Sequence, residues 1–219
     1  SYNIPIVFRI STLDRAADVV IDQPANPEFT PITVAIGANS THSVDLSSLI
    51  DLVENKPANE ILNKGIRILA TEKVNIYYEV VSSYCNCNPE IFTLKGKNAL
   101  GTYFFTPFQN ILNNNGTSYD PVPYSAFDIV ATEDNTTVNI VPTNDVVGHP
   151  AGVVYSVILN RGQTYSARAS SQAAGLHLHG SVVQSDKAIA ITIKDDLLDG
   201  SIYGGCADLA GDQLVPVNR

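Results

Sequence analysis

The chain has 219 residues, of which 44% are hydrophobic and 16% charged, and its formal net charge is −9. This balance is typical of a folded globular protein and excludes an intrinsically disordered one. The negative charge, with no basic stripe between aromatic residues, argues against a nucleic-acid partner. No apolar run approaches the roughly 20 residues that span a bilayer, so we expect no membrane insertion.

Residues 6–24 begin the chain with a pattern of strand, polar turn and strand, and residues 32–46 and 64–81 repeat it. In residues 64–81, apolar and polar side chains alternate on both sides of Thr71-Glu72-Lys73. This alternation is typical of half-buried strands, and the short polar turn between them predicts a β-hairpin. We therefore expect three hairpins in the first part of the chain.

The same three patterns return later in the chain and in the same order. Val19 aligns with Val138, and Val34 aligns with Val157. The matched segments are 6–24 with 125–143, 32–46 with 155–169, and 64–81 with 179–194. Three matches in one order predict a tandem repeat.

We therefore expect an all-β protein made of two tandem antiparallel β-sandwich-like repeats. The first repeat covers residues 1–100 and the second residues 101–219. An aromatic strand at 101–107 opens the second repeat. Its counterpart in the first repeat is missing, or is reduced to residues 2–4.

Residues 45–64 form an insertion that the second repeat lacks. Its apolar residues recur at helical spacing, Ser47 can cap a helix, and Pro57 would end one. The apolar residues are Leu46, Leu49, Ile50 and Val53. We expect a short helix followed by a turn, as a decoration on one face of the first repeat.

A long polar loop at 109–124 is our candidate binding surface. It is rich in Asn and Tyr, which supply amphipathic contact area and adaptable hydrogen bonds in binding loops. The simpler interpretation is a solvated connection. The candidate ligand-binding residues are Asn113, Asn114, Asn115, Tyr119 and Tyr124.

His177 and His179 lie two residues apart, so on a strand both imidazoles would face the same way, a spacing that can bind zinc. A third ligand is lacking, and Leu176 and Leu178 resemble the core-facing side of that strand. We interpret both histidines as facing solvent.

A group of aspartates near the end of the chain could gather oxygen ligands for calcium. These residues lack the order of a D-x-[DN]-x-[DN]-G loop, so we interpret them as a solvated surface and expect no cofactor. They are Asp195, Asp196, Asp199, Asp208 and Asp212.

The three cysteines are Cys85, Cys87 and Cys206. Cys85 and Cys87 are too close for an easy disulfide with each other, and a C-x-C pair alone is a weak zinc signal. One of them could bond to Cys206 if the repeats fold back on each other. A bond to a neighbouring molecule is an equal alternative.

The chain contains no G-x-S-x-G motif and no glycine-rich phosphate loop, so nothing indicates nucleophilic catalysis. A pair of glycosidase carboxylates has no sequence signature of its own. We expect a protein that is not an enzyme, with a carbohydrate-active enzyme domain as the alternative.

Four runs of the second half resemble a known family. They are 127–138, 159–165, 184–190 and 206–216. These runs are similar to the N-terminal type of domain of the IgGFc-binding protein, which also recurs in large secreted bacterial surface proteins. The resemblance covers nearly all of residues 65–219 and, more weakly, residues 4–64. Its motifs are turn and strand signatures, so they do not identify a ligand.

The resemblance implies a non-catalytic binding or adhesion module of a secreted or cell-surface protein. The implied partners are a protein or glycan on a surface and neighbouring repeats of the same chain. A passive structural spacer is a further alternative.

Overall fold

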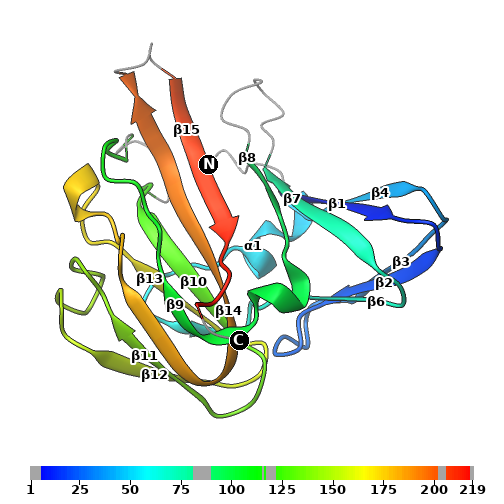
Figure 1. The fold of residues 1–219 in the computed structure, drawn as a ribbon, viewed down its shortest axis with the longest axis horizontal. Coiled ribbons are helices and arrows are strands. Elements are labelled where there is room, and N and C mark those ends of the chain that lie inside the picture. Colours follow the sequence, from blue (N-terminus) through cyan, green and yellow to red (C-terminus); the bar gives the residue numbers. More distant parts are fainter. Residues whose placement is uncertain (1–5, 81–89, 115, 117–121, 202–205, 218–219) are drawn as a thin grey trace.

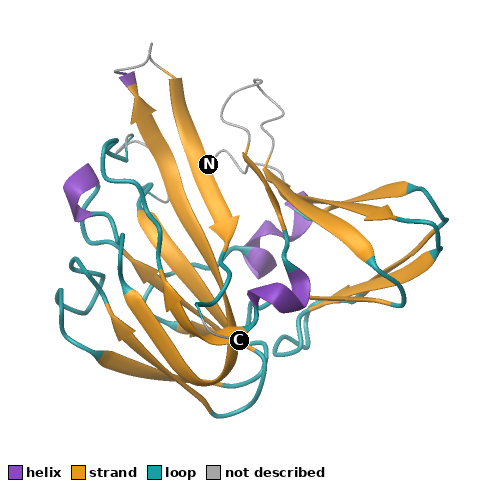
Figure 2. Cartoon of the chain, in the orientation of Figure 1, coloured by secondary structure: helices purple, strands orange, loops and turns teal. Residues whose placement is uncertain are grey.

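The computed structural model describes residues 6–80, 90–114, 116, 122–201 and 206–217. Antiparallel strands form nearly all of its regular structure, together with one short α-helix and three short 3-10 helices in the described residues (Figures 1 and 2). This arrangement confirms the predicted all-β class. The predicted opening residues 2–4 lie outside the described part of the chain.

The first part of the chain forms two sheets that enclose one core. The four-stranded sheet has the order β4-β1-β7-β8, and the three-stranded sheet has the order β3-β2-β6. Buried Phe8 and Ile10 of the first sheet pack with Val19 and Ile21 of the second. The strands are β1 (Ile6–Thr12), β2 (Ala17–Asp22), β3 (Ile32–Ile36), β4 (Thr41–Asp45), β6 (Arg67–Ala70), β7 (Val74–Val80) and β8 (Glu90–Thr93).

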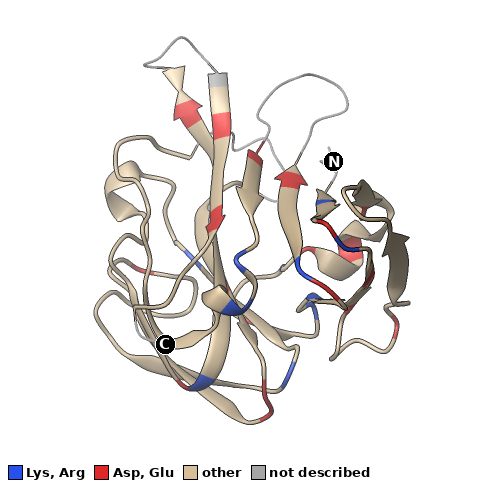
Figure 3. Cartoon of the chain, turned by 45° about the vertical axis from the view of Figure 1, so that its right-hand side comes forward, with Lys and Arg blue, Asp and Glu red and all other residues tan. Residues whose placement is uncertain are grey.

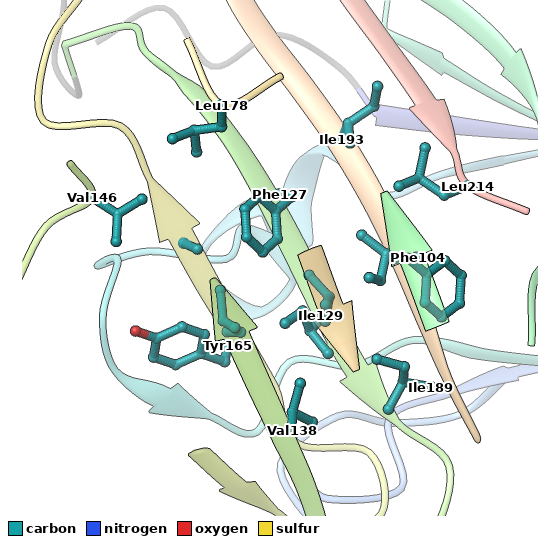
Figure 4. Close-up of a cluster of buried hydrophobic side chains, with 14 of the residues drawn as sticks. Phe104, Phe127, Ile129, Val138, Val146, Tyr165, Leu178, Ile189, Ile193 and Leu214 are labelled. Atoms are coloured by element: carbon teal, nitrogen blue, oxygen red, sulfur yellow. The ribbon is translucent and has the colours of Figure 1, made fainter. Parts of the chain in front are cut away.

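The second part is built around β14 (Val182–Gly200), a strand of 19 residues whose two ends pair with different strands. Its beginning pairs with β9 and β11, and its later residues pair with β10 and β15. Inward side chains from these strands form the core shown in Figure 4. The other strands are β5 (Ile61–Leu62), β9 (Gly101–Phe105), β10 (Ser125–Ala131), β11 (Thr136–Val141), β12 (Tyr155–Leu159), β13 (Thr164–Arg168) and β15 (Cys206–Gln213).

The predicted hairpins are wrong. β6 and β7 flank the Thr71-Glu72-Lys73 turn, but β6 pairs with β2 and β7 pairs with β1. β1 and β2 likewise belong to facing sheets, as do β3 and β4. In the second part, β10 does not pair with β11, nor β12 with β13, and the last predicted hairpin lies within β14. The alternation of apolar and polar residues shows which side of a strand is buried. The pattern is the same whether the next strand pairs with it in one sheet or lies in the sheet across the core.

The same order of strands nevertheless occurs twice. β1 lies between β4 and β7 as β10 lies between β13 and β14, and β2 lies between β3 and β6 as β11 lies between β12 and β14. The register also agrees, because Val19 opposes Val34 and Val138 opposes Val157. This equivalence supports our proposal that residues 1–100 and 101–219 are two copies of one unit.

The insertion contains the expected short helix. η1 (Ser47–Leu49) leads directly into α1 (Ile50–Val53). The hydroxyl of Ser47 does not cap it, because both the hydroxyl and the backbone N–H of Ser47 donate to the carboxylate of Asp45. Leu46 is fully buried in the core of the first part.

The rest of the insertion is not a decoration, because residues 54–65 lie against the second part of the chain. β5 pairs with β13, and the backbone N–H of Gly65 donates to the carbonyl oxygen of Gly162 at 3.0 Å. The hydroxyl of Thr164 donates to Asn55 Oδ1 at 2.7 Å. We call residues 54–65 the bridging segment.

A second contact between the two parts lies where β8 faces β15 (Figure 1). The Lys95 ammonium group forms an ion pair with Asp212, and the Lys95 backbone N–H donates to Gln213 Oε1 at 2.6 Å. A Cβ atom at Gly211 would lie only 3.3 Å from the ring of Phe92. Phe92 in turn stacks on Tyr78, with ring centroids 4.8 Å apart.

Candidate ligand-binding surface

The predicted binding loop contributes both to the surface and to the interior. Asn113 is exposed, and its Oδ1 accepts a hydrogen bond from the backbone of Ala174 at 2.8 Å. Asn114 is only 4% exposed. The ring of Tyr124 lies 4.4 Å from the guanidinium carbon of Arg168. Asn115 and Tyr119, the two other predicted residues, lie outside the described residues.

His177 is buried, which contradicts our interpretation of a solvent-facing pair. Its exposed fraction is 0%, whereas Leu176 beside it is 46% exposed. Neither His177 nor His179 belongs to a strand, because both follow the 3-10 helix η3 (Ala174–Leu176) and precede β14. The predicted strand periodicity therefore does not apply here, and His179 is half-buried.

His177 forms a buried ion pair with Asp195. Its Nδ1 lies 3.1 Å from Asp195 Oδ2, and its Nε2 lies 3.4 Å from the carbonyl oxygen of Gln172. Nδ1 also lies 2.9 Å from the amide nitrogen Nε2 of Gln109, which is a donor. The carboxylate of Asp195 at Nδ1 and the carbonyl oxygen at Nε2 favour the doubly protonated imidazolium. Burial by itself lowers the pKa of His177, but the hydrogen bond and charge of Asp195 outweigh it, so the pKa is raised above its ordinary value.

Two loop segments are attached to this ion pair. Gln109 Nε2 donates to Asp195 Oδ2 at 3.0 Å, while Gln109 Oε1 accepts the backbone N–H groups of Ile111 and Leu112 at 2.9 and 2.8 Å. Asn114 Nδ2 donates to Asp195 Oδ1 at 2.8 Å. Asp195 thus fixes the start of the predicted binding loop beside the segment that carries His177.

We call residues 109–114 and 172–177 together the loop platform. Ile111 on the first segment is 69% exposed and Leu176 on the second is 46% exposed. Asn113, which joins the segments through Ala174, is also exposed. The platform therefore presents apolar and amide groups on a base of buried polar contacts, an arrangement suited to contact with another molecule.

Asp196, the next residue on β14, lies among a different set of charges from Asp195. The pairing of β14 with β15 shifts register between Asp195 and Leu198, and Leu197 has a left-handed backbone with φ of 47°. Burial raises the pKa of Asp196 to about 6; Lys194 opposes this shift, and the nearby charges of Asp128, Asp195 and Glu54 add to it. Lys194 Nζ forms an ion pair with Asp128 Oδ2 at 3.0 Å.

The acidic residues predicted as a candidate calcium site have other partners within the protein. Asp199 accepts a hydrogen bond from the backbone of Ser201, and Asp212 pairs with Lys95. Asp208 accepts one from the backbone of Leu209. Within the described ranges, no three His, Cys, Asp or Glu side chains are grouped so that they could hold a metal ion.

Two of the three cysteines, Cys85 and Cys87, lie outside the described residues, and Cys206 begins β15. The predicted pairing of these cysteines stays untested. Of the helices that the structure describes, none is long and apolar enough to cross a membrane. Acidic and basic residues are spread over both parts of the chain, as Figure 3 shows.

The sequence contained an overlooked signal for the buried ion pair. Ile189, Ile191 and Ile193 all face inward on β14, so the same period places Asp195 on the inward side. A carboxylate on the core side of a strand requires a partner. No comparable signal identifies His177 as that partner, because it comes from a loop.

The fold is an antiparallel β scaffold that carries a fixed pair of surface loops, and loops on such scaffolds commonly hold binding or catalytic residues. The family model described as "IgGFc binding protein" matches residues 92–219, which is more than half of the chain. The chain belongs to this family, as the resemblance predicted, and the family is one of binding domains and not a known enzyme family. The matched range includes the loop platform and β9 through β15. Searches of curated proteins and of solved structures found no match.

Proposed function

We propose that this chain is a non-catalytic extracellular binding module of a secreted or cell-surface protein, and that its ligand is a protein that contacts the loop platform. The observation that carries this proposal is the buried His177–Asp195 pair, which fixes two loops whose outer side chains, Ile111 and Leu176, face solvent. The family is described as "IgGFc binding protein", which names the Fc region of IgG as the ligand of its namesake. An Fc fragment is therefore the first probe to test.

The energetics of the platform support a binding role. A buried ion pair adds little net stability, because the desolvation of both charges offsets their attraction. Its clear effect here is to hold Gln109 and Asn114 in place, and through them the first loop segment. Loops that are ordered before binding lose less conformational entropy when a ligand arrives. The exposed apolar side chains then supply contact area.

The same geometry favours binding over catalysis. Asp195 is 3% exposed and already accepts hydrogen bonds from Gln109 and Asn114. It is therefore not presented to a substrate. Because Asp195 is buried, it cannot form with the adjacent Asp196 the pair of substrate-flanking carboxylates that a glycosidase requires.

Binding to an immobilised IgG Fc fragment, measured by biolayer interferometry, tests the proposal. We expect Ile111→Asp and Leu176→Asp each to weaken binding at least 10-fold, because each places a charge in an apolar contact. Leu13→Asp is the matched control, since Leu13 is 49% exposed in the turn between β1 and β2. An equal loss in the control would place the contact elsewhere.

Two further measurements separate the alternatives on the same preparation. Binding of the protein to a glycan array, together with no binding to Fc, would overturn the proposal of a protein ligand. No binding to either probe would favour a passive spacer. Release of reducing sugar from a polysaccharide would overturn the non-catalytic assignment.

A further inference from the structure

The outer edge of β12 is an unpaired strand edge with exposed apolar side chains. β12 pairs with β11 on one side only. Among the described residues, no hydrogen bond from its backbone reaches a group outside this ladder. Ile158 is 59% exposed, and Val153 and Val154 just before the strand are 53% and 59% exposed. Such an edge is a template for pairing with another strand.

The equivalent strand in the first part of the chain is protected. β3 pairs with β2 as β12 pairs with β11, and Val34 occupies the place of Val157 in the register. By this register, Ala35 stands where β12 has Ile158, and Pro31 stands where the later strand has Val154. Proline is a common means of blocking a strand edge, and residues 153–159 contain none.

We propose that β12 is a self-association edge, which pairs antiparallel with β12 of a second copy of this chain about a two-fold axis at Ser156. In this register Ile158 of each copy lies opposite Val154 of the other, so four exposed apolar side chains become neighbours. Val154, Ser156 and Ile158 are all exposed, as alternate residues on one face should be. An axis at Val157 would instead place Ile158 opposite Ser156 and leave Val154 opposite Asn160.

The absence of charged side chains favours a second copy as the occupant, and the small buried area sets the strength of its binding. Residues 153–159 carry no charged side chain, so two chains with a net charge of −9 can meet there without opposing like charges. Other outer strands carry charges at their edges, such as Asp45 of β4 and Glu90 of β8. Seven residues of edge pairing bury well under the roughly 1,200 Å² that marks stable interfaces. We therefore expect a weak dimer, which added salt strengthens by screening the net charge.

Sedimentation velocity of the full chain from about 10 μM to about 1 mM tests the proposal, since weak interfaces associate in this range. We expect a monomer–dimer equilibrium that Ile158→Lys shifts at least 10-fold toward monomer. Ala35→Lys is the matched control, because it places the same charge at the equivalent position of the protected edge. Circular dichroism melting of both variants excludes misfolding as the cause of any loss.

A cross-linking experiment tests the register. With Cys85, Cys87 and Cys206 replaced by Ser, the variant Ser156→Cys should form a disulfide-linked dimer on oxidation, because the two-fold axis brings both copies of residue 156 together. Thr33→Cys on β3 should stay monomeric.

Three results would overturn the proposal. They are a wild-type chain that stays monomeric at the highest concentration, a dimer that survives Ile158→Lys, and species larger than a dimer, since a two-fold contact is closed.

Discussion

Asn59 of the bridging segment accepts a hydrogen bond from the hydroxyl of Tyr165, at 2.7 Å, across the boundary between the two parts of the chain. Its backbone N–H donates to the carbonyl oxygen of Ser166 at 3.0 Å, and His149 Nε2 lies 3.0 Å from the same side-chain oxygen. In Figure 4 the hydroxyl of Tyr165 points away from the core cluster, toward its edge. Asn59, which belongs to the first part of the chain, therefore provides hydrogen-bond partners for polar groups of the second part.

Replacing Asn59 with Ala should destabilise the protein by about 2–4 kcal/mol, because Tyr165 and His149 lose their shared acceptor and alanine must adopt a φ of 64°. Urea denaturation followed by circular dichroism measures this change. Asn39→Ala is the matched control, since Asn39 also has a positive φ, of 51°, but is exposed in a turn. A loss in the control as large as in Asn59→Ala would mean that backbone strain alone explains the effect.

Gly65 provides a steric test of the same boundary. A Cβ atom at this position would lie 2.5 Å from Val130 Cγ2 and 2.6 Å from the carbonyl oxygen of Gly162, so Gly65→Ala must push the bridging segment away from the second part. We expect a loss of about 1–3 kcal/mol, as for other overpacked sites. Hydrogen exchange should show reduced protection at Thr164 and Tyr165, which pair with β5. Gly175→Ala, with nothing within 4 Å of its added Cβ, should leave both measurements unchanged.

These contacts mark the limit of what the sequence could show. Alternation correctly predicted the strands and the all-β class, because burial on one face leaves a period of two. It could not distinguish a hairpin from a connection across the core, as β6 and β7 demonstrate. The role of the bridging segment is also absent from the local sequence, because Asn59 makes its contacts with residues about 100 positions away. The sequence of the insertion itself gives no sign of these long-range contacts.

The candidate site was predicted only in part for the same reason. The composition of the 109–124 loop indicated a contact surface, and Asn113 does lie at the surface of the loop platform. The polar base beneath it joins Gln109, His177 and Asp195 from three separate segments. The fold brings these three residues together, and their proximity cannot be read from a single sequence whose strand pairings are unknown.

The ion pair of the platform should give the stability a defined pH dependence. Because the folded state raises the pKa of His177, the stability from this group is fully present below the unfolded value of about 6.5, and is lost as the pH rises through the higher folded value. His177→Gln leaves Asp195 buried without its cation and should cost about 3–5 kcal/mol at pH 5.5. The difference from wild type should shrink by pH 9. Urea denaturation at both values measures it, and a difference that grows with pH would contradict the assignment.

Exposed His42 on β4 supplies the control for that series. His42→Gln should leave the stability close to that of wild type, because the side chain of His42 is exposed to solvent. Fc binding by His177→Gln at pH 7, compared with that of His42→Gln, then shows whether the platform must be ordered to bind. We expect weaker binding in the first variant only.

Mutation of Asp196 should raise the stability, whereas mutation of His177 lowers it, because the ionised form of Asp196 is unfavourable in the folded state. Its pKa is raised to about 6, so the stability associated with it is full below the unfolded value of about 3.9 and is lost as the pH rises through 6. Asp196→Asn removes this carboxylate, while Lys194 keeps its ion pair with Asp128. The variant should be more stable than wild type at pH 7.5 by about 1–2 kcal/mol, allowing for solvent screening of a partly exposed group.

That gain should disappear by pH 4, where wild-type Asp196 is already protonated in the folded state. Thermal melts at pH 4 and pH 7.5 measure both values, with Asp14→Asn in the exposed β1–β2 turn as the control. A variant less stable than wild type at pH 7.5 would mean that the attraction of Lys194 outweighs burial and the neighbouring carboxylates. The charge of Lys194, although paired with Asp128, would then stabilise the ionised carboxylate of Asp196 at neutral pH, whereas the raised pKa of Asp196 predicts that this ionised form destabilises the fold.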